Sequence, residues 1–185
     1  MKRSLLLAAA LSLGCAASPV PRPPQPDAGD ASRLEPAPWS APRLAPEAVP
    51  PIYLQVWRSA ENRQRCALLA PEPNDSASGE GAAARAATFS GGWAIAYDQP
   101  SLRSAFGVAG TGVSAWESGI YDDWPYQITW ADSSRAGYGQ EVANDPNWLA
   151  YLRIPGQDCL YNVWSRLGRT HLEQWIGRLR FVDAR

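Results

Sequence analysis

Residues 93–97 read Trp-Ala-Ile-Ala-Tyr, so large apolar side chains alternate with alanine. A period of two is that of a β-strand, and it places the large side chains on one face and the small ones on the other. After a link that contains Pro100, Phe106 and Val108 continue the alternation. We therefore expect two antiparallel strands joined as a hairpin, with the rings gathered on one of its faces.

Further strand patterns lie on both sides of this hairpin. Runs of β-favouring residues predict strands near 53–57, 63–70 and 84–89 before it, and near 126–130 after it. Residues 148–154 are almost continuously apolar, which is typical of a central strand covered on both faces. A short strand at 180–182 is expected to close the fold.

Helical spacing is found only near the C-terminus. Apolar residues fall at i, i+3, i+4 and i+7 in 160–167 and again in 172–179, which predicts two helices. Thr170 and Glu173 have the spacing of a capping box at the start of the second helix. The sequence thus predicts an α+β domain, mainly an antiparallel sheet with two C-terminal helices.

The overall composition excludes several kinds of site. The 185 residues include 17 basic and 18 acidic side chains, and the net charge of −1 argues against the basic surface of a nucleic-acid binder. A single histidine cannot supply the two or three imidazoles of most catalytic zinc centres. We expect no metal site and no cofactor.

The N-terminus has the form of a secretory signal. Lys2 and Arg3 precede the apolar run 5–13, which is too short to span a membrane. Residues 12–15, Ser-Leu-Gly-Cys, resemble the lipobox of bacterial lipoproteins, in which the signal is cut before a cysteine that has received a lipid. The resemblance implies a signal peptide at 1–14, a lipid on Cys15 and, because Ala16 follows, sorting to the outer membrane.

The sequence departs from the lipobox pattern at one position. Ser12 stands where a large aliphatic residue is usual. The alternative is cleavage by the ordinary secretory peptidase near 15–17, which would release a soluble protein.

The rest of the chain divides into a spacer and a domain. Residues 19–51 hold eleven of the seventeen prolines, so 15–51 is expected to be a lipidated cysteine followed by a disordered proline-rich tether. Residues 52–185 hold nearly all the aromatic side chains and form the predicted globular domain.

Two cysteines, Cys66 and Cys159, remain in that domain. An even pair in an oxidising compartment predicts a disulfide, and closing so long a loop stabilises the fold by about 4 kcal/mol. Two buried free thiols are the alternative.

Aromatic side chains near residue 120 are the candidate binding residues. Their rings could stack on the apolar faces of sugars while neighbouring polar groups hold the hydroxyls, or anchor a protein interface. They could equally fill the core. The candidates are Trp116, Tyr121, Trp124 and Tyr126.

Carboxylates in the same stretch are the remaining catalytic candidates. Glu117 with Asp122 or Asp123 could act as the acid and base of a glycosidase, although loop acids more often cap turns. His171 lies close to Glu173, but residues two apart on a helix do not face each other. We therefore expect a non-enzymatic envelope module, either a binding domain for glycan or a protein partner or a structural subunit; the alternative is a small envelope glycan hydrolase.

The lipid anchor can be tested directly. Cys15→Ser removes the only thiol that the lipobox offers for acylation, so the protein should leave the membrane fraction. Fractionation after export, followed by immunoblotting, measures this. An unchanged distribution would show that Cys15 does not anchor the chain.

Overall fold

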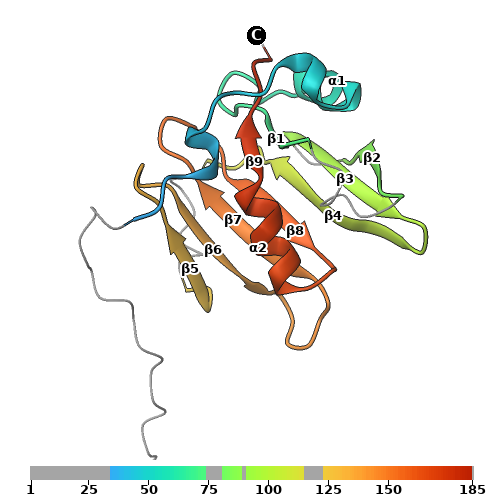
Figure 1. Ribbon diagram of the computed structural model, residues 1–185, viewed down its shortest axis with the longest axis vertical. Coiled ribbons are helices and arrows are strands. Elements are labelled where there is room, and N and C mark those ends of the chain that lie inside the picture. Colours follow the sequence, from blue (N-terminus) through green and yellow to red (C-terminus); the bar gives the residue numbers. More distant parts are fainter. Residues whose placement is uncertain (1–33, 74–80, 89–90, 115–122, 185) are drawn as a thin grey trace, which may run out of the picture.

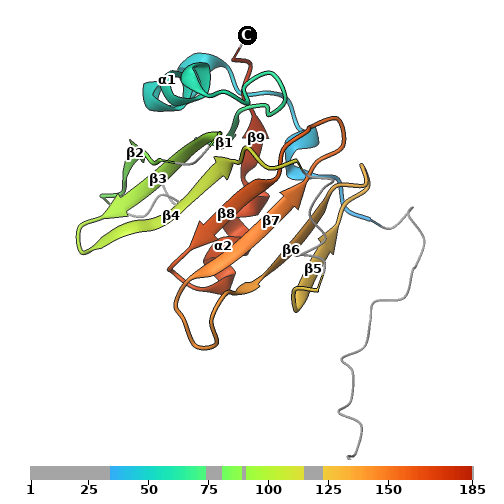
Figure 2. The same cartoon turned by 180° about the vertical axis from the view of Figure 1, so that it is seen from behind.

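The computed structural model describes residues 34–73, 81–88, 91–114 and 123–184. These residues form a seven-stranded antiparallel sheet in the order β2-β3-β4-β8-β7-β6-β5, with α2 lying across one face (Figures 1 and 2). Its strands are β2 (Ala83–Ala86), β3 (Trp93–Gln99), β4 (Leu102–Gly110), β5 (Tyr126–Thr129), β6 (Arg135–Gln140), β7 (Trp148–Arg153) and β8 (Tyr161–Ser165).

Smaller elements complete the described fold. A second, two-stranded sheet pairs β1 with β9, and two nine-residue helices, α1 and α2, accompany the sheets. None of the helices in the described ranges is long and apolar enough to cross a membrane. The bounds are α1 (Pro51–Ser59), β1 (Leu69–Pro71), α2 (Arg169–Gly177) and β9 (Leu179–Phe181), with short 3-10 turns η2 (Pro38–Ser40) and η3 (Pro46–Ala48).

The predicted hairpin is confirmed as β3 and β4. Ile95 pairs with Val108 and Tyr97 with Phe106, so the large side chains share one face as the alternation predicts. The rings of Tyr97 and Phe106 stack with their centroids 4.8 Å apart. The strand predicted near 148–154 is also confirmed as β7, which lies between β6 and β8.

Trp175 joins α2 to the hairpin. Its ring centroid lies 5.2 Å from that of Tyr97 and 4.8 Å from that of Phe106, in edge-on geometry. Its indole N–H donates to the carbonyl oxygen of Gly107 at 3.2 Å. Because Trp175 is fully buried, this contact fixes which face of the sheet the helix covers.

The prediction of a helix at 160–167 is wrong: the segment contains strand β8, and α2 is the one helix that the described residues form near the C-terminus. β8 pairs with β4 on one side and β7 on the other. The same apolar residues also have strand alternation, since Tyr161 and Val163 are fully buried while Trp164 faces the other way. Backbone hydrogen bonds to β4 and β7 stabilise the segment as a strand, and the apolar spacing within the segment gives no information about these long-range partners.

The prediction of a strand near 53–57 is also wrong, because α1 occupies this segment. Pro51 lies in the first turn of the helix, where its missing N–H costs nothing. Tyr53 and Trp57, one turn apart, are the buried residues of α1. Of the strand predicted at 63–70, only Leu69 and Ala70 belong to β1.

Residues 34–50 pack onto the domain, whereas the prediction placed them in a disordered tether. Trp39 is 4 % exposed and donates its indole N–H to Asp132 Oδ2 at 3.0 Å and Ser134 Oγ at 3.1 Å. Leu44 forms a parallel bridge with Val182. An aromatic anchor and sheet hydrogen bonds offset the proline content here; the remainder of the predicted tether lies outside the described residues.

The predicted disulfide is confirmed. Cys66 and Cys159 are bonded across 93 positions of sequence, and both are fully buried. Trp57 donates its indole N–H to the carbonyl oxygen of Cys66 at 2.9 Å. The bond therefore connects the loop after α1 to the loop before β8.

Trp39→Ala should destabilise the domain, because it leaves a cavity and removes two hydrogen bonds from the N-terminal segment. We expect the free energy of unfolding to fall by about 3–5 kcal/mol, measured by denaturant titration. Glu47→Ala, an exposed position in the same segment, is the control and should change little. Equal, small effects of both variants would contradict the packing of residues 34–50.

Candidate ligand-binding face

The seven-stranded sheet has two unlike faces. The helix face carries the large core side chains, and both α1 and α2 pack against it. The second face carries the alternate residues of each strand, and Figure 2 shows the sheet from the side opposite α2. Along β7, for example, Leu152 belongs to the core cluster of the helix face, while Tyr151 points to the second face.

Trp164 lies on the second face over a glycine. It pairs with Gly107 across β8 and β4, and a Cβ at Gly107 would overlap the six-membered ring of the indole. The absence of a side chain at Gly107 thus allows the ring to lie close to the sheet. Trp164 remains partly exposed in this position.

Trp124 and Tyr151 form a second aromatic contact on this face. Their ring centroids are 5.6 Å apart with an interplanar angle of 75°. Trp124 lies close to Gly139, where an added Cβ would be 3.0 Å from the indole. Both rings are partly exposed. Tyr151 is diagonal to Trp164 on the neighbouring strand, a position within reach of long side chains.

Polar side chains accompany these rings. Tyr151 pairs with Asn162 of β8 on one side and with Gly137 on the other, and Gly137 in turn pairs with Gln127. At the next row Arg153 pairs with Arg135, which is exposed. Aromatic faces and hydrogen-bonding groups therefore occur together on the second face.

A network of polar contacts holds the β2–β4 end of the sheet. Arg85 donates to Asp98 Oδ2 at 2.8 Å and to Ser104 Oγ at 2.6 Å, while the Ser104 backbone N–H donates to Asp98 Oδ1 at 2.7 Å. The hydrogen bond from Arg85, with that from Ser104, lowers the pKa of Asp98 below its usual value. This carboxylate stabilises the hairpin end in its ionised form.

Tyr126 lies on the helix face, opposite Trp124. Its ring stacks on Tyr138 at 5.3 Å, and the Arg169 guanidinium lies 3.8 Å from its centroid. Glu173 accepts hydrogen bonds from Tyr138 at 2.6 Å and Arg169 at 2.7 Å. The predicted capping box is therefore wrong: Gly168 is the N-cap of α2, without a side-chain cap.

The Glu173 cluster shifts two pKa values. Burial and the hydrogen bond to Glu173 raise the pKa of Tyr138 to about 12. Burial would raise the pKa of Glu173, but the hydrogen bonds from Tyr138 and Arg169 outweigh it and lower the pKa. Both groups are thereby held in their ordinary neutral-pH forms, which suits a structural contact between α2 and β6.

His171 is part of the packing between α2 and the sheet. Its Nδ1 lies 2.9 Å from Ser165 Oγ, and its ring centroid lies 4.8 Å from that of Phe106. Ser165 is fully buried, and its Oγ also accepts the Leu167 backbone N–H at 3.0 Å. A buried hydroxyl held in this way connects the end of β8 to α2.

The sequence-predicted site residues are only partly brought together. Trp124 and Tyr126 lie on opposite faces, and Asp123 is exposed beside Trp124. Within the described ranges, no three His, Cys, Asp or Glu side chains gather to hold a metal ion. The other candidates, Trp116, Glu117, Tyr121 and Asp122, lie outside the described residues, as does Cys15.

Tyr151 and Trp164 are binding candidates that the sequence analysis missed. Trp164 was assigned to a helical stripe, and Tyr151 to a strand covered on both faces. The alternation of Asn162 and Trp164 with Tyr161 and Val163 is the signal that could have revealed the second face.

No known family model, curated protein or solved structure matches this chain at a significant level.

Asp98 should contribute a pH-dependent part of the stability. Because its pKa is lowered in the fold, the stabilisation is present above the unfolded value of about 3.9 and is lost as the pH falls through the folded pKa. Asp98→Asn should therefore reduce the free energy of unfolding at pH 7, and the difference from wild type should shrink below about pH 4.

Denaturant titrations between pH 7 and pH 2.5 measure this difference, with the exposed Glu141→Gln as control. A difference between Asp98→Asn and wild type that is constant over the whole range would contradict the account.

Proposed function

We propose that this chain is a cell-envelope lipoprotein whose domain is a non-enzymatic binding module for glycan. The observation that carries the proposal is the set of partly exposed rings on the second face, Trp124, Tyr151 and Trp164. The helix face is buried by the packing of Trp175 and its neighbours, so these rings belong to the side of the sheet that α2 leaves uncovered.

The mixture of groups on the second face favours glycan over an apolar protein patch. Sugar rings present C–H faces that pack on flat aromatic rings, and hydroxyls that need donors and acceptors around them. Gln127 supplies an exposed amide group in the same row as Tyr151, and Arg135 supplies an exposed guanidinium in the next row. Binding sites commonly combine apolar rings with a few polar groups that fix orientation.

Two further observations support a place in the envelope. The lipobox-like residues 12–15 would anchor the chain, and a disulfide between Cys66 and Cys159 suits an oxidising compartment. The proline-rich residues that follow Cys15 would separate the lipid anchor from the domain.

The proposal is tested by retention of the full-length chain on insoluble peptidoglycan and on immobilised polysaccharides. Trp164→Ala, Tyr151→Ala and Trp124→Ala should each weaken binding several-fold, up to about tenfold, because an aromatic contact is worth about 0.5–1.5 kcal/mol beyond the area that it buries. Phe181→Ala is the matched control, since this partly exposed ring lies in β9 and contacts Arg43.

Retention that is unchanged in all three second-face variants would contradict the proposal. If the chain captures an envelope protein instead of glycan, and the same three variants lose this binding, the ligand is a protein. Release of new reducing ends that Glu117→Gln or Asp123→Asn abolishes would replace the binding module by the alternative, a glycan hydrolase.

A further inference from the structure

A polar pocket of about 540 Å³ lies beside the disulfide, away from the rings of the second face. Five parts of the chain line it: Arg43 of the N-terminal segment, Trp57 at the end of α1, the loop 63–68, the turn 156–158 and the C-terminal residues 182–184. Its volume is within the range of small-molecule sites. Segments this distant in sequence meet here because the disulfide and the β1–β9 sheet bring them together.

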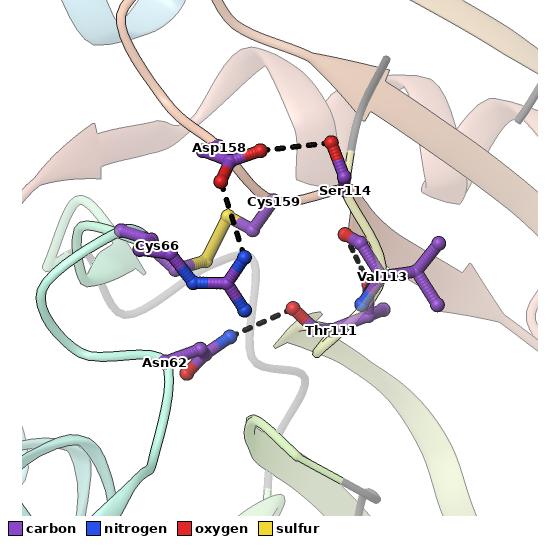
Figure 3. A network of polar contacts seen from close by, with 8 residues as sticks. Asn62, Cys66, Thr111, Val113, Ser114, Asp158 and Cys159 are labelled. Carbon is purple, nitrogen blue, oxygen red and sulfur yellow. Dashed lines mark hydrogen bonds and ion pairs between the residues drawn. A yellow bond between two sulfur atoms is a disulfide. The ribbon is translucent and has the colours of Figure 1, made fainter. Parts of the chain in front are cut away.

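The walls of the pocket are held in place on both sides of the disulfide. The Ala67 backbone N–H donates to Gln157 Oε1 at 2.8 Å, and the Asp158 backbone N–H donates to the Arg65 carbonyl oxygen at 2.9 Å. Figure 3 shows the surrounding polar contacts, in which Asn62 donates to the carbonyl oxygen of Thr111 at 2.7 Å. A pocket fixed in this way loses little conformational entropy when it binds a ligand.

The carboxylate of Asp158 is already engaged. Its Oδ1 accepts a hydrogen bond from Ser114 Oγ at 2.8 Å, and its Oδ2 lies 3.1 Å from Arg65 Nη1. Figure 3 shows Ser114 and Asp158 beside the Cys66–Cys159 bond. The hydrogen bond from Ser114 and the Arg65 guanidinium lower the pKa of Asp158, so its charge is present and matched by that of Arg65.

Two other guanidiniums line the pocket without a carboxylate partner in the described part of the chain. Arg43 lies 5.0 Å from the centroid of the Phe181 ring, which holds it over an aromatic face. Arg63 donates to the carbonyl oxygen of Ala60 at 3.3 Å. Asp183 is the one further acid among the described residues that line the pocket, so these residues place three arginines against two carboxylates.

We propose that this pocket binds a phosphate group, with Arg43 and Arg63 as its anchoring residues. A guanidinium presents parallel N–H donors that match the oxygens of an oxyanion. The terminal oxygens of a phosphate monoester or diester are arranged around a tetrahedral phosphorus, so they can accept hydrogen bonds from two separate guanidiniums at once. The remaining volume accommodates the organic part of a phosphate ester or of a phospholipid headgroup.

The test is calorimetric titration of the full-length chain at low salt with glycerol 3-phosphate, and separately with monomeric short-chain phosphatidylglycerol. Saturable binding of one equivalent is expected. Arg43→Gln and Arg63→Gln should each weaken it at least tenfold; both side chains are exposed, and an unchanged thermal midpoint would show that the variants fold. Arg58→Gln is the control, because it removes the same charge from α1 outside the pocket.

The two probes separate the sources of the phosphate. Binding of glycerol 3-phosphate indicates a soluble ester, whereas binding of the lipid alone indicates a headgroup, and both support the proposal if they depend on Arg43 and Arg63. Failure of both probes to saturate, or an equal loss in Arg58→Gln, would overturn it. Glycan retention by the second face is independent of either result.

Discussion

The packing of Trp175 against Tyr97 and Phe106 determines which face of the seven-stranded sheet is covered by α2 and which is left uncovered by it. Centroid distances of 4.8–5.2 Å and the hydrogen bond to the Gly107 carbonyl hold α2 on one face of the sheet. A nine-residue helix without a side-chain N-cap has little stability of its own, so its position depends on this tertiary contact. Because α2 covers the helix face, the strand side chains that α2 leaves uncovered are those on the second face.

On the second face, large aromatic rings lie close to the backbone and yet stay partly exposed. Glycines at 107 and 139 remove the bulk that would lift the Trp164 and Trp124 rings away from the sheet, so large rings lie close to the backbone and stay partly exposed. The domain's stability comes from other places, namely the disulfide, the N-terminal segment held by Trp39, and the aromatic core of the helix face. Substitutions in the second face can therefore be expected to affect binding more than folding.

The sequence pattern predicted an element correctly where the spacing of apolar residues fitted a strand but not a helix. The alternation at 93–97 predicted β3, and the continuous apolar run predicted β7. Residues 160–167 fit a helix and a strand equally well, and only pairing with β4 and β7 decides between them. β6 was missed because Gly137 and Gly139 interrupt its pattern. For the site, Trp124 could be predicted as a candidate, but its separation from Tyr126 and its contact with Tyr151 depend on strand register.

The most direct measurement of the central claim uses the indole N–H signals in a ¹H–¹⁵N correlation spectrum during titration with soluble peptidoglycan fragments. We expect saturable shifts of the signals from Trp124 and Trp164, the two described tryptophans with rings on the second face. The signals of Trp39, Trp57 and Trp175, whose N–H groups are hydrogen-bonded inside the core, should stay in place. Shifts confined to those buried signals, or none at saturating fragment, would contradict the claim that the second face is the binding surface.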